Sequence, residues 1–84
     1  MVIKLNLEVF DYLVNKLLLN QKGIKHELKL NKYPHYIFIE LNADTSYKIR
    51  ELAMDRLQIV GFDIKYDLTE EGKILEDIID LFYI

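Results

Sequence analysis

The stretch HYIFIELN, at His35–Asn42, is the clearest β-strand in the sequence and the starting point for its fold. Side chains of a strand alternate between its two sides, so this stretch would place Ile37, Ile39 and Leu41 together on one side. Such a row is typical of a buried sheet face. The other row consists of Tyr36, Phe38, Glu40 and Asn42. We therefore predict an inner strand with an ordinary aliphatic core face and an unusual aromatic face.

Three further stretches show the same period-two alternation and are predicted strands: Val2–Leu7, Ile24–Leu30 and Phe62–Leu68. Between the second of these and HYIFIELN lie the turn-forming residues Asn31–Pro34. This order predicts a β-hairpin.

Three other stretches repeat apolar residues at spacings of three and four, which predicts helices. The first covers Glu8–Lys22 and the second runs from Ala43 to Val60. The third follows Thr69, and its apolar positions are Ile74, Leu75, Ile78, Ile79, Leu81 and Phe82. Polar residues that accept backbone hydrogen bonds precede each helix. The predicted N-caps are Asn6, one of Asp44, Thr45 and Ser46, and Thr69.

The predicted order is strand, helix, strand, strand, helix, strand, helix. Two split β-α-β units of this kind form a ferredoxin-like antiparallel sheet with helices on one face, and here a C-terminal helix is added. The class is α+β, and residues 1–84 form a single domain, because 84 residues hold one hydrophobic core. The first and third strands would be central, which makes HYIFIELN an inner strand.

The composition narrows the class of protein further. The chain is 51% hydrophobic and 30% charged, which is typical of an ordered globular domain. It contains no cysteine, so it forms neither disulfides nor thiolate metal sites, and a reducing cytoplasm is expected. We find no signal peptide and no apolar run long enough to span a membrane. The abundance of lysine, isoleucine and asparagine indicates a bacterial or phage origin.

The aromatic face of the predicted sheet is the candidate partner-binding site. Its predicted members, on three of the four predicted strands, are Lys25, Lys29, Tyr36, Phe38, Glu40, Asp63 and Lys65. Three alternatives remain for what covers this face: the C-terminal helix, a protein partner or second copy of the chain, and a nucleic acid. Exposed apolar patches mark interfaces, whereas aromatics among lysines on a sheet resemble the base-stacking surface of RNA-recognition modules. The net charge of −3 disfavours nucleic acid.

No catalytic motif or cofactor-binding motif is present, so we do not expect an enzyme. Asp63 and Asp67 would lie about 13 Å apart on one strand, too far to share a metal ion. His26 and His35 lack an accompanying cysteine or carboxylate pattern and are weak metal ligands by themselves. Phosphate-binding glycine loops, HExxH and nucleophile elbows are all missing from the sequence.

One segment resembles a known family. YDLTEEGKILEDII, Tyr66–Ile79, looks like the strand that leaves the wing of bacterial winged-helix regulators and enters their last helix. That resemblance implies DNA binding. The chain, however, places a hairpin where those regulators carry their helix-turn-helix pair.

The sequence therefore predicts a small non-enzymatic protein that acts through protein–protein interaction, such as an inhibitor, an immunity-type protein or an accessory protein. Acidic residues around the aromatic face would favour a basic partner. A homodimer through the same face is the competing arrangement. The alternative function is nucleic-acid binding, by the sheet face or in a winged-helix manner.

Overall fold

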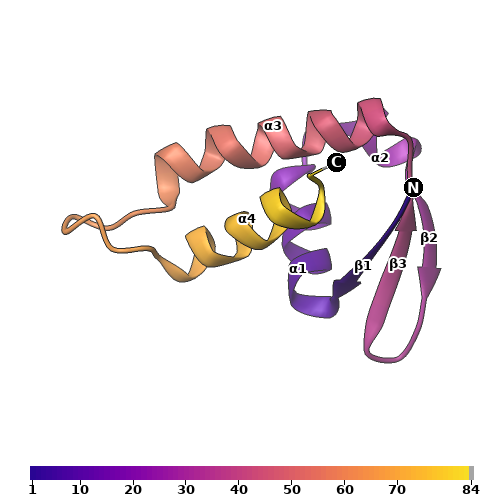
Figure 1. The fold of residues 1–84 in the computed structure, drawn as a ribbon, viewed down its shortest axis with the longest axis horizontal. Coiled ribbons are helices and arrows are strands. Elements are labelled where there is room, and N and C mark those ends of the chain that lie inside the picture. The colour runs from indigo at the N-terminus through magenta and orange to yellow at the C-terminus, as the bar shows by residue number, and fades with distance from the viewer. Residues whose placement is uncertain (84) are drawn as a thin grey trace.

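An antiparallel sheet of three strands packs against helices in the computed structural model, which describes residues 1–83 (Figure 1). The protein is α+β, with four α-helices and one short π-helical segment in the described part of the chain. The elements are β1 (Val2–Asn6), α1 (Leu7–Tyr12), a π-helical segment (Leu13–Leu17), α2 (Lys22–His26), β2 (Lys29–Lys32), β3 (Tyr36–Glu40), α3 (Ala43–Val60) and α4 (Glu70–Leu81).

The sheet has the order β1-β3-β2, so β3 is its central strand as predicted. β1 places Lys4 opposite Phe38, and β2 places Lys29 opposite Glu40. The N-terminal ammonium of Met1 extends the pairing of β1 with β3, because it donates to the carbonyl of Leu41 at 3.0 Å. β3 therefore has all of its neighbours within the chain, whereas β1 and β2 are edge strands.

The hydrophobic core lies between one face of the sheet and the helices α1, α3 and α4. The aliphatic row of β3 is buried there, as predicted from the alternation of HYIFIELN. Both the sheet and the helices contribute fully buried side chains to this core. Among them are Leu5, Leu13, Leu18, Ile39, Ile49, Leu75, Ile78 and Phe82. The helices thus cover one face of the sheet only.

The predicted fourth strand is not part of this sheet. Phe62–Leu68 forms a projecting turn between α3 and α4, and only the single bridge Phe62↔Leu68 links its ends. The carboxylate of Asp63 holds the turn, because its Oδ1 accepts the backbone N–H groups of Lys65 at 2.8 Å and Asp67 at 3.0 Å. The ferredoxin-like arrangement is therefore not confirmed, and β1, which it places centrally, is an edge strand.

The predicted strand Ile24–Leu30 is wrong over most of its length. Residues 22–26 form α2, and β2 begins only at Lys29. Ile24 and Leu28 are both partly buried against the core. Their spacing of four residues fits one face of a helix as well as one face of a strand, so the alternation was ambiguous. The backbone N–H of Glu27, which donates to the carbonyl of Ile24 at 3.0 Å, continues the helical turn.

Two of the predicted helix caps are confirmed. Asn6 accepts the backbone N–H of Val9 at 2.8 Å, and Thr69 accepts that of Gly72 at 2.9 Å. The cap of α3 is Asn42, which accepts the backbone N–H of Thr45 at 2.8 Å, so the predicted cap was placed too late. Thr45 and its neighbour Ser46 are instead buried inside the fold.

Candidate functional site

The open face of the sheet carries the aromatic row of β3 and is the best candidate site. α4 does not cover it, contrary to one of the sequence-based alternatives. The apolar side chains of α4, Leu75 and Ile78, lie in the core together with Phe82 on the opposite side of the sheet. Tyr36 and Phe38 are therefore half-exposed. The side chains of this open face are Val2, Lys4, Asn6, Lys29, Asn31, Tyr33, Tyr36, Phe38 and Glu40.

Three aromatic rings form one cluster on this face. Tyr33 stacks on Tyr36 with ring centroids 5.0 Å apart and an interplanar angle of 22°. Phe38 meets both rings edge to face, at 5.6 Å from Tyr33 and 5.4 Å from Tyr36. These are the separations at which aromatic pairs attract each other. The cluster is thus a preorganised apolar patch rather than a set of independent side chains.

Tyr33 is the member of this cluster that the sequence-based prediction missed. It directly follows β2, and its backbone N–H donates to the carbonyl of Tyr36 at 3.0 Å. Only Pro34 and His35 separate these paired residues, so the hairpin is tighter than predicted. A two-residue loop places Tyr33 directly opposite Tyr36. A sequence-based prediction with this hairpin register would have included Tyr33 in the aromatic face.

Two lysines and one glutamate supply the charges of the face. Lys4 of β1 holds its Nζ 4.5 Å from the ring centroid of Tyr36, a cation–π distance. Lys4 of β1 and Tyr33, which follows β2, approach Tyr36 from the two flanks of β3, so the Tyr36 ring has a neighbour on each flank. Lys29 lies opposite Glu40 in the ladder.

Three of the predicted site residues do not belong to this face. Lys25 lies on α2, and Asp63 and Lys65 lie in the projecting turn after α3. They were assigned to the face because they were expected on sheet strands that do not form. The structure therefore brings Tyr36, Phe38, Glu40 and Lys29 together and removes the acidic rim that Asp63 was expected to provide.

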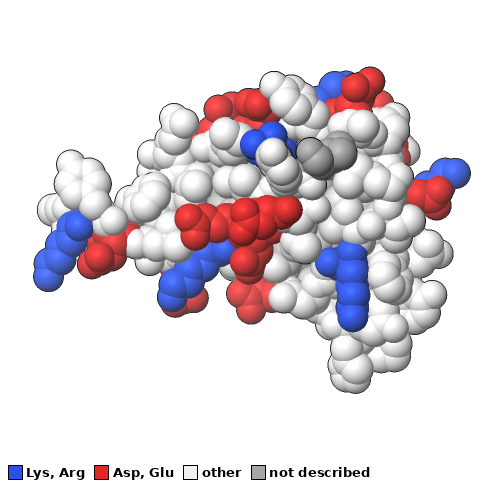
Figure 2. Space-filling view, in the orientation of Figure 1, with Lys and Arg blue, Asp and Glu red and all other residues white. Residues whose placement is uncertain are grey.

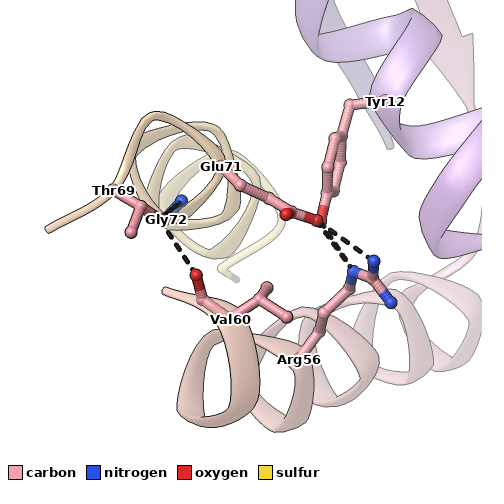
Figure 3. Close-up of polar contacts among 6 residues, drawn as sticks. All are labelled: Tyr12, Arg56, Val60, Thr69, Glu71 and Gly72. Atoms are coloured by element: carbon pink, nitrogen blue, oxygen red, sulfur yellow. Dashed lines mark hydrogen bonds and ion pairs between the residues drawn. The ribbon is translucent and has the colours of Figure 1, made fainter. Parts of the chain in front are cut away.

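A second polar arrangement links α1, α3 and α4 on the core side (Figure 3). The hydroxyl of Tyr12 donates to Oε2 of Glu71 at 2.5 Å and accepts from Nε of Arg56 at 2.8 Å. Arg56 also pairs with Glu71, at 3.1 Å from its Nη2. Burial and the hydrogen bond to Glu71 raise the pKa of Tyr12 to about 12. Tyr12, Arg56 and Glu71 thus form hydrogen bonds to one another, and we interpret these three side chains as a clamp that holds the helices together.

This clamp predicts a pH-dependent stability. The pKa of Tyr12 is raised from 10.0 in the unfolded chain to about 12 in the folded protein. The protonated hydroxyl therefore contributes fully to the free energy of unfolding below pH 10, and this contribution is lost as the pH rises through about 12. Tyr12→Phe should lower the free energy of unfolding by about 1–2 kcal/mol at pH 7. The difference from wild type should shrink above pH 10 in urea unfolding experiments.

The exposed Tyr83 provides the control for this measurement. Tyr83→Phe should leave stability near wild type at pH 7. If Tyr12→Phe and wild type instead differ by the same amount at pH 8 and at about pH 11, the clamp does not contribute through the proton of Tyr12.

Neither a metal-binding cluster nor a membrane-spanning helix is found in the described part of the chain. Among residues 1–83, no three histidine, aspartate or glutamate side chains are grouped so that they could hold a metal ion. No helix in the same part of the chain is long and apolar enough to cross a membrane.

The chain matches no protein-family model, no curated protein and no solved structure.

Proposed function

We propose that this chain is a non-enzymatic binding protein whose open sheet face contacts a protein partner. The observation that carries the proposal is the cluster of Tyr33, Tyr36 and Phe38 on a sheet face that no described helix covers. Aromatic side chains are enriched at the centres of protein interfaces because they bury large areas at a small cost in conformational entropy. An inhibitor, an immunity-type protein or an accessory protein would use such a patch.

The charges around the cluster indicate the chemistry of the partner. Lys4 and Lys29 flank the rings, and Glu40 is the one carboxylate of the face. A matching surface would be apolar at its centre, with carboxylates positioned to meet the two lysines. The basic partner expected from the sequence depended on an acidic rim to which Asp63 and Asp67 contributed, and both of these residues lie in the projecting turn instead. An acidic rim on the partner is therefore the better match for this face.

Nucleic acid fits the same face less well. Base stacking requires an aromatic ring with a free side, and Tyr36 has Tyr33 and Lys4 as neighbours on its two flanks. Phe38 presents its edge to both tyrosines. Stacking a base between these rings would first require the cluster to separate.

A capture experiment tests the proposal. The tagged protein is incubated with extract of its source organism, and bound proteins are quantified for wild type, Tyr36→Ser/Phe38→Ser and the control Tyr47→Ser. Tyr47 is an exposed tyrosine of α3. We expect the sheet-face variant to lose its specific partner by at least about tenfold, as expected for aromatic anchors at an interface centre, and Tyr47→Ser to retain it. Equal capture by all three proteins would refute the proposed face.

A second measurement separates the two classes of partner. Single-stranded RNA and DNA of about ten nucleotides, the size of a typical single-strand site, are titrated at low salt and followed by fluorescence anisotropy. We expect no saturable binding. Salt-sensitive binding that Tyr36→Ser/Phe38→Ser abolishes would replace the protein partner by a nucleic acid.

A further inference from the structure

The projecting turn between α3 and α4 carries the two most exposed large apolar side chains among the described residues. Ile64 is 95% exposed and Tyr66 is 86% exposed, and Ile59 near the end of α3 is 79% exposed. Figure 1 shows this turn extending away from the body of the protein. Apolar side chains so fully in water, and adjacent to one another, are expected where another molecule covers them.

The turn is held in one shape. Asp63 accepts two backbone hydrogen bonds within it, and the backbone N–H of Asp63 donates to the carbonyl of Asp67 at 2.9 Å. Tyr66 has a φ of 65°, in the left-handed region that is unfavourable for a bulky side chain. Strained conformations of this kind concentrate at binding sites. Ile64, Lys65 and Tyr66 are thus presented at the tip of the turn in a fixed arrangement, and we call these three residues the tip.

A groove of about 360 Å³ lies between α3 and α4 on the same helical hairpin. Met54, Leu57 and Ile79 form its apolar part, and its polar lining consists of Gln58, Glu76 and Asp80. Figure 2 shows acidic side chains gathered over α4. The groove therefore combines an apolar surface with negative charge. The tip combines two apolar side chains with one positive charge, at Lys65.

We propose that two copies of this chain form a symmetric dimer in which the tip of each copy occupies the α3–α4 groove of the other. Ile64 and Tyr66 would contact the apolar part of the groove, and Lys65 would face Glu76 and Asp80. Antiparallel apposition of the two hairpins satisfies both contacts at once, as a two-fold axis requires.

The edge strand β2 is a poorer site for self-association. It exposes all four of its residues and carries Lys29 and Lys32. Antiparallel pairing of two β2 strands would bring these lysines of both copies close together, and like charges on paired strands repel. The dimer inferred here leaves the aromatic sheet face free, so it is independent of the function proposed above.

Sedimentation velocity over a wide protein concentration range tests the dimer. Wild type should show a concentration-dependent dimer, and Ile64→Ser/Tyr66→Ser should weaken it by at least about tenfold, since two buried apolar anchors are lost at each of two sites. Tyr36→Ser/Phe38→Ser is the matched control and should dimerise like wild type. A monomeric wild type, or a dimer lost only in the sheet-face variant, would overturn the proposal.

Charge reversal identifies the groove as the contact. Lys65→Glu alone and Glu76→Lys/Asp80→Lys alone should each weaken the dimer, because each places like charges together. Combining the three changes should restore it. Lys65, Glu76 and Asp80 are all exposed, so the charge changes should not disturb the fold, and circular dichroism checks that each variant is folded. Failure of the combined variant to regain association relative to both parents would show that the tip does not meet this groove.

Discussion

Phe82→Ala is expected to cost about 3–5 kcal/mol of unfolding free energy, the largest single effect of any substitution considered for this protein. Phe82 lies two residues from the end of the chain, yet its side chain is completely buried. Its carbonyl also accepts a hydrogen bond from the hydroxyl of Ser46 at 2.9 Å, inside the protein. Truncation would leave a cavity beneath α4 and weaken the attachment of α4 to α3.

Urea denaturation followed by circular dichroism measures this loss. Domains of this size are stabilised by about 5–15 kcal/mol in total, so the variant should be marginally folded at 25 °C. The neighbouring Tyr83 is 65% exposed, and Tyr83→Ala should cost less than about 1 kcal/mol. Similar effects of the two truncations would mean that the end of the chain does not pack into the core.

Gly72→Ala should destabilise the protein by about 1–3 kcal/mol, because α4 approaches the end of α3 too closely for a side chain. A Cβ at this position would lie 2.3 Å from the carbonyl oxygen of Gly61 and 2.9 Å from its Cα. Both are backbone atoms. The carbonyl of Gly61 also accepts the backbone N–H of Thr69 at 2.8 Å, which limits its movement. The clash therefore outweighs the gain in helix propensity that alanine normally brings.

Gly23→Ala is the matched control, because it makes the same chemical change in an uncrowded helix. No atom lies within 4 Å of a Cβ built on Gly23, and its φ is not positive. Alanine favours helix over glycine by about 1 kcal/mol, so this variant should be equal to wild type or slightly more stable. Thermal unfolding should therefore occur at a lower temperature than in wild type for Gly72→Ala but not for Gly23→Ala. Equal shifts would contradict the close approach of α3 and α4.

Local patterns in the sequence predicted the parts of the fold that depend on local physics. HYIFIELN was correctly identified as the inner strand, because its aliphatic residues alternate without interruption. Asn6 and Thr69 were correctly identified as helix caps, since their side chains bond to backbone groups only three residues away. Both kinds of signal act within a few residues and need no knowledge of the rest of the chain.

The errors arose where one pattern fitted two structures. Ile24 and Leu28 suit a helix face and a strand face equally, and the helix was selected by packing against the core. Phe62–Leu68 alternates like a strand but has no sheet edge within reach. The α3–α4 hairpin carries it away from β1, and the bonds of Asp63 close it as a turn. The predicted site included Lys25, Asp63 and Lys65 because these residues were assigned to strands that do not form.

By itself, the sequence determined the α+β class, the central strand and the pairing of an aliphatic face with an aromatic face. Only the tertiary structure decided that α4 packs on the core side and leaves Tyr36 and Phe38 uncovered. The physical reason is that the stripe of α4 is apolar enough to cover either face of the sheet. The outcome depends on the turn Phe62–Leu68, which reverses the chain after α3, and on the close contact between Gly61 and Gly72 at the two ends of that turn.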